Sequence, residues 1–181
     1  MKILSLLLIV LASATAVIAQ QTKFSEQLGL GYSSGIKSND FSPGGNSGGF
    51  AFGTVGDFVL NKNFGLGLGV DINIIGMNHI EESLTPVFAD FRIMGQGRWK
   101  PYIALDPGFC LYYNNLKNGN SQRGSWYAGA ASGLWFPSKH ILHFFIQAKY
   151  NYQRTLTSYT GSAGKVSGSL DIFNFLAGYA F

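Results

Sequence analysis

The stretch FGLGLGVDINII, residues 64–75, decides the fold of this chain. From Phe64 to Ile74, every even position is aromatic or aliphatic, and the odd positions carry glycine, Asp71 or Asn73. Alternation of this kind is the period of a β-strand, because successive side chains of a strand point to opposite faces. Its length is about twice that of an ordinary soluble strand. A tilted strand of this length rises roughly 28 Å, which is enough to cross the hydrocarbon core of a membrane.

The same alternation recurs in seven further segments, so the sequence predicts eight strands. They are residues 24–36, 49–60, 84–95, 101–113, 125–136, 141–154 and 169–181. The connections alternate between long or polar segments (37–47, 79–83, 115–124 and 156–168) and short turns (61–63, 96–100 and 137–140). This layout is typical of outer-membrane barrels. We therefore expect an all-β, eight-stranded, antiparallel, up-and-down transmembrane β-barrel over residues 20–181, with both termini on the periplasmic side.

The composition favours lipid rather than water around this barrel. Charged residues make up 12% of the 181 residues, about half the usual share of a soluble protein, while aromatics reach 15% and glycines number 24. A soluble barrel such as a lipocalin is the alternative, but its outer wall would be rich in Lys and Glu. Glycine suits the interior of a narrow barrel, where small residues leave room for large ones. We expect the apolar face to point outward.

The first 19 residues read as a secretory signal peptide. Lys2 precedes an apolar run, and the segment ends in the cleavage-like sequence Val17-Ile18-Ala19. The single cysteine, Cys110, is expected to be a small buried apolar residue. The basic residues are scattered, so we expect no nucleic-acid partner. No metal-ligand spacing, phosphate loop or nucleophile elbow appears, so no cofactor is predicted.

Five charged residues fall on the polar face of their strands and should point into the lumen: Asp71, Asp90, Arg92, Asp106 and Lys149. Charges in a narrow, water-poor space must pair, because an unpaired ion there costs several kcal/mol. Bulky residues of the same face should help to fill the lumen; they are Phe88, Met94, Tyr102, Tyr112 and Phe145. We expect at least one of the two cations to contact one of the three aspartates, giving a plug. A selective pore lining is the alternative.

Two further groups of residues have functional interpretations. The segment HIEES, with His79, Glu81, Glu82 and Ser83, contains the histidine, serine and acidic residue types of an enzymatic site but reads more simply as a solvated external loop. Aromatic residues near the strand ends suit interfacial girdles, where rings meet lipid headgroups. Those near the short turns are Trp99 and Trp135; Tyr32, Tyr150, Tyr152 and Trp126 complete the set.

Taken together, the mature chain resembles the small eight-stranded outer-membrane barrels of Gram-negative bacteria, in particular barrel domains common in Bacteroidetes envelopes. The resemblance lies in the signal peptide, the eight alternating segments, KPYIALDPGF after a short turn, and the terminal GYAF. It implies that Phe181, with Tyr179 two residues earlier, acts as an assembly signal for the barrel assembly machinery. It also implies a non-enzymatic role in envelope integrity or surface interaction. A lipid A-modifying enzyme and a narrow solute channel are the alternatives.

Overall fold

The structure is a computed structural model that describes residues 23–38, 47–77, 80–115, 120–122, 124–136, 142–158 and 165–181. Side chains are described at 24–35, 48–76, 83–111, 126–136, 142–154 and 169–181. The described strands are β1 (Lys23–Ser38), β2 (Ser47–Val59), β3 (Phe64–Met77), β4 (Ile80–Met94), β5 (Lys100–Asn115), β6 (Asn120–Gln122), β7 (Gly124–Phe136), β8 (His143–Ser158) and β9 (Lys165–Ala180). Within these ranges, no helix is both long and apolar enough to cross a membrane.

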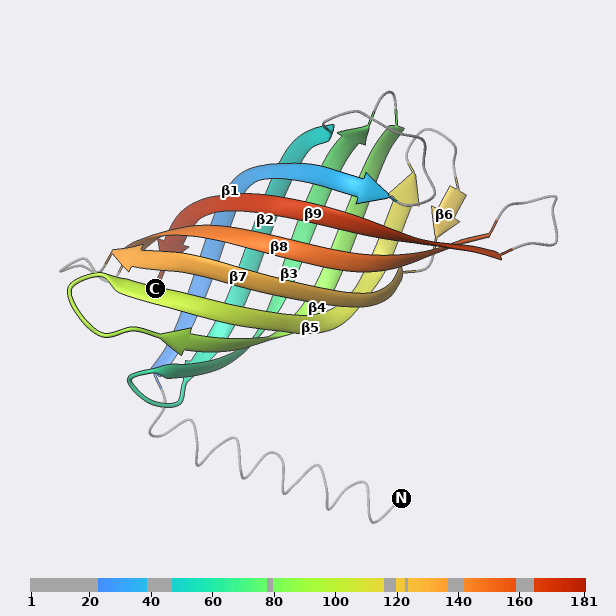
Figure 1. Cartoon of the computed structure of the whole chain (residues 1–181). Coiled ribbons are helices and arrows are strands. Elements are labelled where there is room, and N and C mark those ends of the chain that lie inside the picture. Colours follow the sequence, from blue (N-terminus) through green and yellow to red (C-terminus); the bar gives the residue numbers. More distant parts are fainter. Residues whose placement is uncertain are drawn as a thin grey trace, which may run out of the picture.

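Eight of these strands form a closed antiparallel barrel. Each long strand pairs with the next long strand along the chain, and β1 pairs with β9, so the sheet has no free lateral edge over the paired residues. The seam of β1 and β9, coloured blue and red in Figure 1, includes the pair Tyr32↔Phe175. Up-and-down connectivity with closure is the predicted fold class, and the structure confirms it.

The two faces of the barrel wall divide as the alternation predicts. On β3, Leu68 is 72% exposed and points outward, whereas Ile75 is fully buried. Phe50 of β2 is also 72% exposed, and its neighbour Ala51 is buried. Large apolar side chains therefore cover the outside of the barrel, as on a surface that faces lipid. This confirms the predicted outward orientation of the apolar face.

Three predicted loops are shorter than expected, because their polar residues continue the strands. Strand β4 begins at Ile80, so most of HIEES is strand, and His79 lies outside the described residues. Strands β8 and β9 pair as far as Ser158↔Lys165, inside the segment predicted as a long loop. The predicted loop 115–124 contains the short strand β6, which pairs with the end of β5. Antiparallel hairpins can extend through polar residues, since their backbone bonds do not depend on an apolar face.

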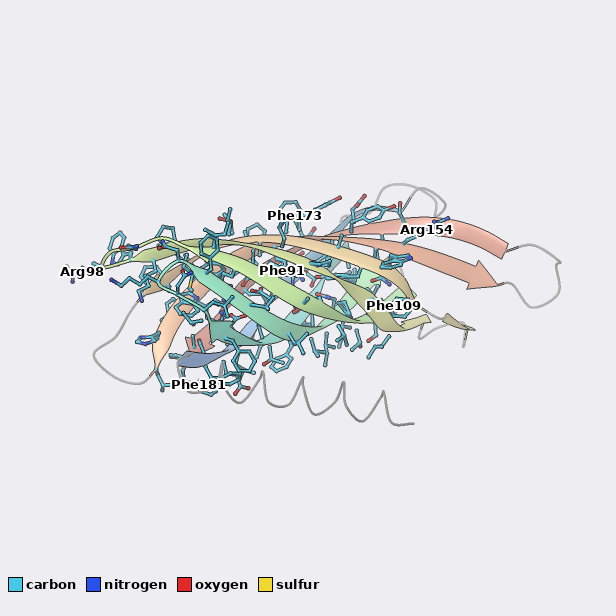
Figure 2. The ribbon with its side chains drawn as sticks, turned by 90° about the horizontal axis from the view of Figure 1, so that it is seen from below. Phe91, Arg98, Phe109, Arg154, Phe173 and Phe181 are labelled. Atoms are coloured by element: carbon cyan, nitrogen blue, oxygen red, sulfur yellow. The ribbon has the colours of Figure 1, made fainter. Side chains whose placement is uncertain are left out.

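The β2–β3 and β4–β5 turns and the C-terminus lie at the same end of the barrel. Figure 1 shows the β2–β3 and β4–β5 turns beside the end of β9, while the β8–β9 hairpin projects from the opposite end. In Figure 2, Arg98 and Phe181 lie toward the short-turn end and Arg154 lies toward the other. The main chain of Phe181 exchanges hydrogen bonds with Glu26 at 2.8 and 2.9 Å. The seam is therefore closed as far as the last residue.

One predicted girdle residue is placed differently. Trp99, Trp126 and Tyr152 are exposed on the outside, as the girdle prediction requires, but Trp135 is only 7% exposed and points into the lumen. The prediction for Trp135 was wrong because it rested on the nearby short turn and not on the position within the strand. Trp135 has the parity of the lumen-facing Ala131 on β7. Cys110, as expected, is fully buried in an apolar cluster.

Candidate functional site: the charged lumen

The lumen is filled in layers, and the inward residues of β3 follow them in order. From the short-turn end, two glycines are followed by Gly69, Asp71, Asn73 and Ile75. Asp71 belongs to a layer of charges, Asn73 to a layer of amides, and Ile75 to an apolar cluster. Eight strands enclose a space that side chains can just fill, and each of these layers lies at its own height along the lumen.

The charged layers are organised around two buried cations, the first of which is Arg92 of β4. Its Nη2 donates to Asp90 Oδ2 at 2.9 Å, and its Nη1 forms an ion pair with Asp57 Oδ2 at 3.0 Å. Gln27 of β1 also donates to Asp57 Oδ2, at 3.0 Å. The guanidinium lies 4.6 Å from the ring centroid of Tyr102, a cation–π distance. We refer to Asp57, Asp90 and Arg92 as the arginine clamp.

The second cation is Lys149 of β8, which is 1% exposed. Its Nζ lies 2.7 Å from Asp71 Oδ2 and 2.7 Å from Asp106 Oδ2, so it connects β3 and β5 across the lumen. The ammonium also lies 3.7 Å from the ring centroid of Phe88. We refer to Asp71, Asp106 and Lys149 as the lysine clamp. An ion removed from water in this way is stable only with its partners in place.

Glycines on the inner wall make room for the large side chains around the clamps. A Cβ at Gly69 would overlap the ring of Phe88, and one at Gly133 would overlap the ring of Tyr102. Gly67 lies between Asp57 and Asp90 in the register of β2, β3 and β4, and a Cβ there would overlap Asp57 Oδ1. The glycine-rich strand is therefore the complement of the bulky residues on the strands around it.

Neutral layers lie on both sides of the clamps. An amide cluster of Ser33, Asn73 and Asn174 is joined by hydrogen bonds of 2.7 Å from Ser33 Oγ to Asn174 Oδ1 and from Asn174 Nδ2 to Asn73 Oδ1. At the short-turn end, a buried apolar cluster includes Met94, Trp135 and other residues. A second apolar cluster, which includes Ile75, lies toward the opposite end.

The structure places all five charged residues named from the sequence in the lumen and brings them into the two clamps. Sequence reasoning missed Asp57, the sixth member. The signal was present, because Asp57 alternates with the outward residue Phe58 in β2. Of the predicted bulky residues, Phe88, Met94, Tyr102 and Phe145 are buried, and the side chain of Tyr112 lies outside the described residues.

The other candidate chemistry is limited by what is described. His79 and the side chains of Glu81 and Glu82 lie outside the described residues. In the described part of the chain, no group of three or more His, Cys, Asp or Glu side chains is arranged to hold a metal ion. Among the described residues, the two clamps are thus the one buried array of ionisable groups. Their arrangement is that of ion pairs inside a barrel.

The fold and its apolar exterior define the class: this chain has the fold of the small eight-stranded outer-membrane β-barrels of Gram-negative bacteria, which supports an outer-membrane location. No protein-family model matches the chain, and no curated protein matches it in sequence. Comparison with solved structures, in contrast, finds proteins with a similar fold.

Three such structures span nearly the whole barrel. Neisserial surface protein A (NspA) superposes with a TM-score of 0.63 at 15% identity, covering 87% of this chain and 95% of that one. The outer membrane protein OprG from Pseudomonas aeruginosa gives 0.54 at 11%, covering 87% and 93%. Ail, the attachment invasion locus protein of Yersinia pestis, gives 0.51 at 17%, covering 88% and 99%. At these identities the likeness shows the fold, and the Bacteroidetes affinity stays a prediction.

Proposed function

We propose that this protein is a non-enzymatic integral outer-membrane barrel with a plugged lumen, which acts through its outer surface in envelope integrity or surface interaction. The observation that carries the proposal is the pair of clamps. Each buried cation is held by two aspartates and lies against an aromatic ring. Asp90 lies on the same strand as its cation, and the other three aspartates lie on other strands. Side chains that are this tightly paired occupy the path a solute would have to take.

The layers above and below the clamps support the plug. The lumen-facing residues of the two apolar clusters are at most 7% exposed, and the amide cluster is fully buried or nearly so. A conducting barrel needs a continuous polar and hydrated path, which apolar layers at both ends oppose. We therefore do not favour the channel alternative. No observation among the described residues favours the lipid A-modifying alternative.

The proposed orientation places the short turns and both termini of the mature chain in the periplasm. In outer-membrane barrels the short turns are periplasmic and the longer loops are external. Phe181 lies at the short-turn end, where the assembly machinery of the resembling family is expected to bind the last strand. The surface role itself rests on analogy with the fold, and fold alone does not establish a function.

Epitope accessibility on intact cells tests the location and the orientation together. A short epitope inserted into residues 159–164 should be bound by antibody on intact cells. The same epitope inserted at Lys62, in the β2–β3 turn, should be bound only after the outer membrane is permeabilised. Equal labelling of both insertions on intact cells would contradict the proposed orientation, and recovery of the protein in the soluble periplasmic fraction would contradict the membrane location.

Mass spectrometry of lipid A tests the non-enzymatic part of the proposal. Lipid A from cells that overproduce the protein should have the same masses as lipid A from cells without it. The matched control is the Ser83→Ala variant, because Ser83 belongs to the segment that suggested hydrolysis. A change in lipid A mass that appears with the wild type and disappears with Ser83→Ala would replace the proposal with an enzymatic one.

A further inference from the structure

The clamps are not balanced in charge. Among the side chains that the structure describes as buried, the ionisable acidic and basic groups are Asp57, Asp71, Asp90 and Asp106 against Arg92 and Lys149. Each cation is shared by two carboxyl groups, so each clamp would have one negative charge in excess if every aspartate were ionised. An uncompensated charge in a space without bulk water is costly, and a buried group then neutralises itself instead.

The arrangement of the carboxyl groups shows where the compensation would occur. Asp57 Oδ2 and Asp90 Oδ2 lie 3.0 and 2.9 Å from nitrogens of the same guanidinium, and Asp90 falls between the pairs Phe88↔Gly108 and Phe91↔Leu105, a register that puts it opposite Asp106. An ionised carboxylate only accepts hydrogen bonds. Two carboxyl groups can therefore bond to each other only when one of them carries a proton, and two adjacent carboxylates cannot both stay ionised at low cost.

A second observation points to the same atoms. The Oδ1 oxygens of Asp57, Asp90 and Asp106 are buried and receive no hydrogen bond from any described group, although the Oδ2 oxygen of each is held by a clamp cation. Asp71 has no such orphan oxygen. The buried oxygens without a donor thus belong to the three aspartates that the shared guanidinium and the register bring together. A proton on one of them would supply the missing donor.

We propose that Asp57, Asp90 and Asp106 form a proton-binding chain that joins the two clamps and takes up at least one proton when the barrel folds. A proton suits the chain better than a metal ion, because no described group has the arrangement of a metal site. Gly67 allows the chain to form, since it has no side chain between Asp57 and Asp90. The proposal goes beyond the plug, because a barrel can bind protons whether or not it conducts.

The other groups packed around the proton-binding chain come from six strands. The charged or titratable ones are Asp71 on β3, Arg92 on β4, Tyr102 on β5, Tyr127 on β7 and Lys149 on β8. β1 contributes the neutral amide of Gln27. Substitution of one aspartate of the proton-binding chain at a time leaves all of these groups in place. The difference in pH dependence between the variant and the wild type therefore reports on the proton-binding chain.

The pH dependence of the unfolding equilibrium tests the proton-binding chain directly. Above about pH 5, an aspartate of the unfolded chain has lost its proton. A proton held only by the folded state then makes unfolding more favourable as the pH rises, by about tenfold in the unfolding equilibrium constant per pH unit for each such proton. Stability is therefore greatest at the acid end of the range and decreases toward neutral pH.

The measurement is urea unfolding of the refolded full barrel in phospholipid vesicles between about pH 5 and pH 7, for the wild type and Asp106→Asn. Because the Asn amide donates as the protonated acid does, Asp106→Asn should fold and should reduce the pH dependence by up to tenfold per pH unit relative to the wild type. Asp171→Asn is the control. Asp171 accepts a 2.6 Å hydrogen bond from Tyr150 on the outside of the barrel, and its variant should keep the wild-type pH dependence.

Infrared spectroscopy of the wild type at about pH 6 gives a readout that does not depend on a variant. A protonated carboxyl band should be present, and it should decrease in Asp106→Asn or, if that variant does not fold, in Asp90→Asn. Parallel pH profiles of unfolding for the wild type and Asp106→Asn, or the absence of such a band, would overturn the proposal of a proton-binding chain. Stabilisation by millimolar calcium would assign the excess charge to a metal ion and would also overturn it. Conductance is a separate readout, so failure of the plug and failure of the chain are distinguishable.

Discussion

Strand β3 contributes to both walls of the barrel, the inner wall that lines the lumen and the outer wall, and its residues on the two walls are of opposite kinds. On the inner wall, Asp71 is 2% exposed and its carboxylate lies 2.7 Å from a lysine ammonium that belongs to the far side of the lumen. On the outer wall, three residues earlier, Leu68 is 72% exposed and no polar partner is needed. Successive residues of the same strand thus alternate between an ion-paired interior and an apolar exterior.

The difference teaches that the two walls follow opposite rules for the same substitution. A charge is tolerated inside only with a specific partner, and its removal leaves that partner unpaired. A charge outside has no partner to find, and its cost depends on depth in the bilayer. Size follows a similar division, since glycine is required inside wherever a large ring covers it. Each rule predicts a measurable contrast.

The largest contrast should come from removing a clamp cation on the inner wall. Lys149→Met leaves Asp71 and Asp106 without their cation, and it should lower the free energy of unfolding by about 3–5 kcal/mol in urea titrations in bilayers. Arg154→Met is the control on the same strand, because Arg154 is exposed on the outer wall, and it should change stability by no more than about 0.5 kcal/mol. Equal effects of the two variants would mean that the clamp contributes nothing.

Introducing a charge on the outer wall should have the next largest effect. Leu68→Arg places a guanidinium in the middle of the apolar belt, and it should lower the free energy of folding into bilayers by about 2–4 kcal/mol. Leu60→Arg, at the short-turn end, is the control and should cost only about 0–1 kcal/mol. A barrel that tolerated both arginines equally, or that stayed monomeric in water without detergent, would contradict the lipid-facing wall.

Adding a methyl group on the inner wall tests the fit of the lumen. Gly69→Ala puts a Cβ into the ring of Phe88, and overpacking of this kind costs about 1–3 kcal/mol. Gly65→Ala is the matched control, because its Cβ would meet the Cβ of Arg92 at an ordinary 3.7 Å. Thermal or urea unfolding of the two variants should separate them. If Gly69→Ala proved as stable as Gly65→Ala, the lumen would be looser than the contacts indicate.

The smallest effect on stability should come from the last residue of the outer wall. Phe181→Ser keeps the backbone hydrogen bonds to Glu26 and should lower the stability of the finished barrel by less than about 1 kcal/mol. Its insertion in cells should nevertheless be slower than that of the wild type, measured by pulse labelling and membrane fractionation. Phe175→Ser, on the same face of β9, should insert at the wild-type rate. Equal rates for all three proteins would remove the role of Phe181 as an assembly signal.

The sequence was sufficient for the outer wall and for the number of long strands, because a lipid-facing strand repeats every two residues over its whole length. It failed where strands leave the apolar belt. The polar residues after Met77 and before Ser169 carry no alternation, yet they pair in β4 and β9. Trp135 was placed incorrectly because the nearby short turn was weighed above its position in the strand. Asp57 was omitted from the lumen charges although its position in the strand pointed inward.

The partners within the lumen could not be predicted from the chain. Lys149 and Asp71 are 78 residues apart, and their meeting depends on how the strands are staggered around the closed barrel. Alternation gives the face of each residue but not its height relative to residues on strands across the lumen. The identity of each clamp is therefore a property of the register, as is the meeting of Asp57 and Asp90 at the guanidinium of Arg92.

Ion conductance in planar bilayers tests the central claim most directly, because the proposed plug predicts a barrel that does not conduct. Purified wild-type protein, inserted in one orientation and shown to be folded, should give little or no steady conductance. Lys149→Gln, which weakens the lysine clamp, should at most produce brief and irregular openings. Stable, reproducible conductance steps from the wild type, with an ion preference that changes in Asp90→Asn or Lys149→Gln, would contradict the plug and identify the protein as a channel.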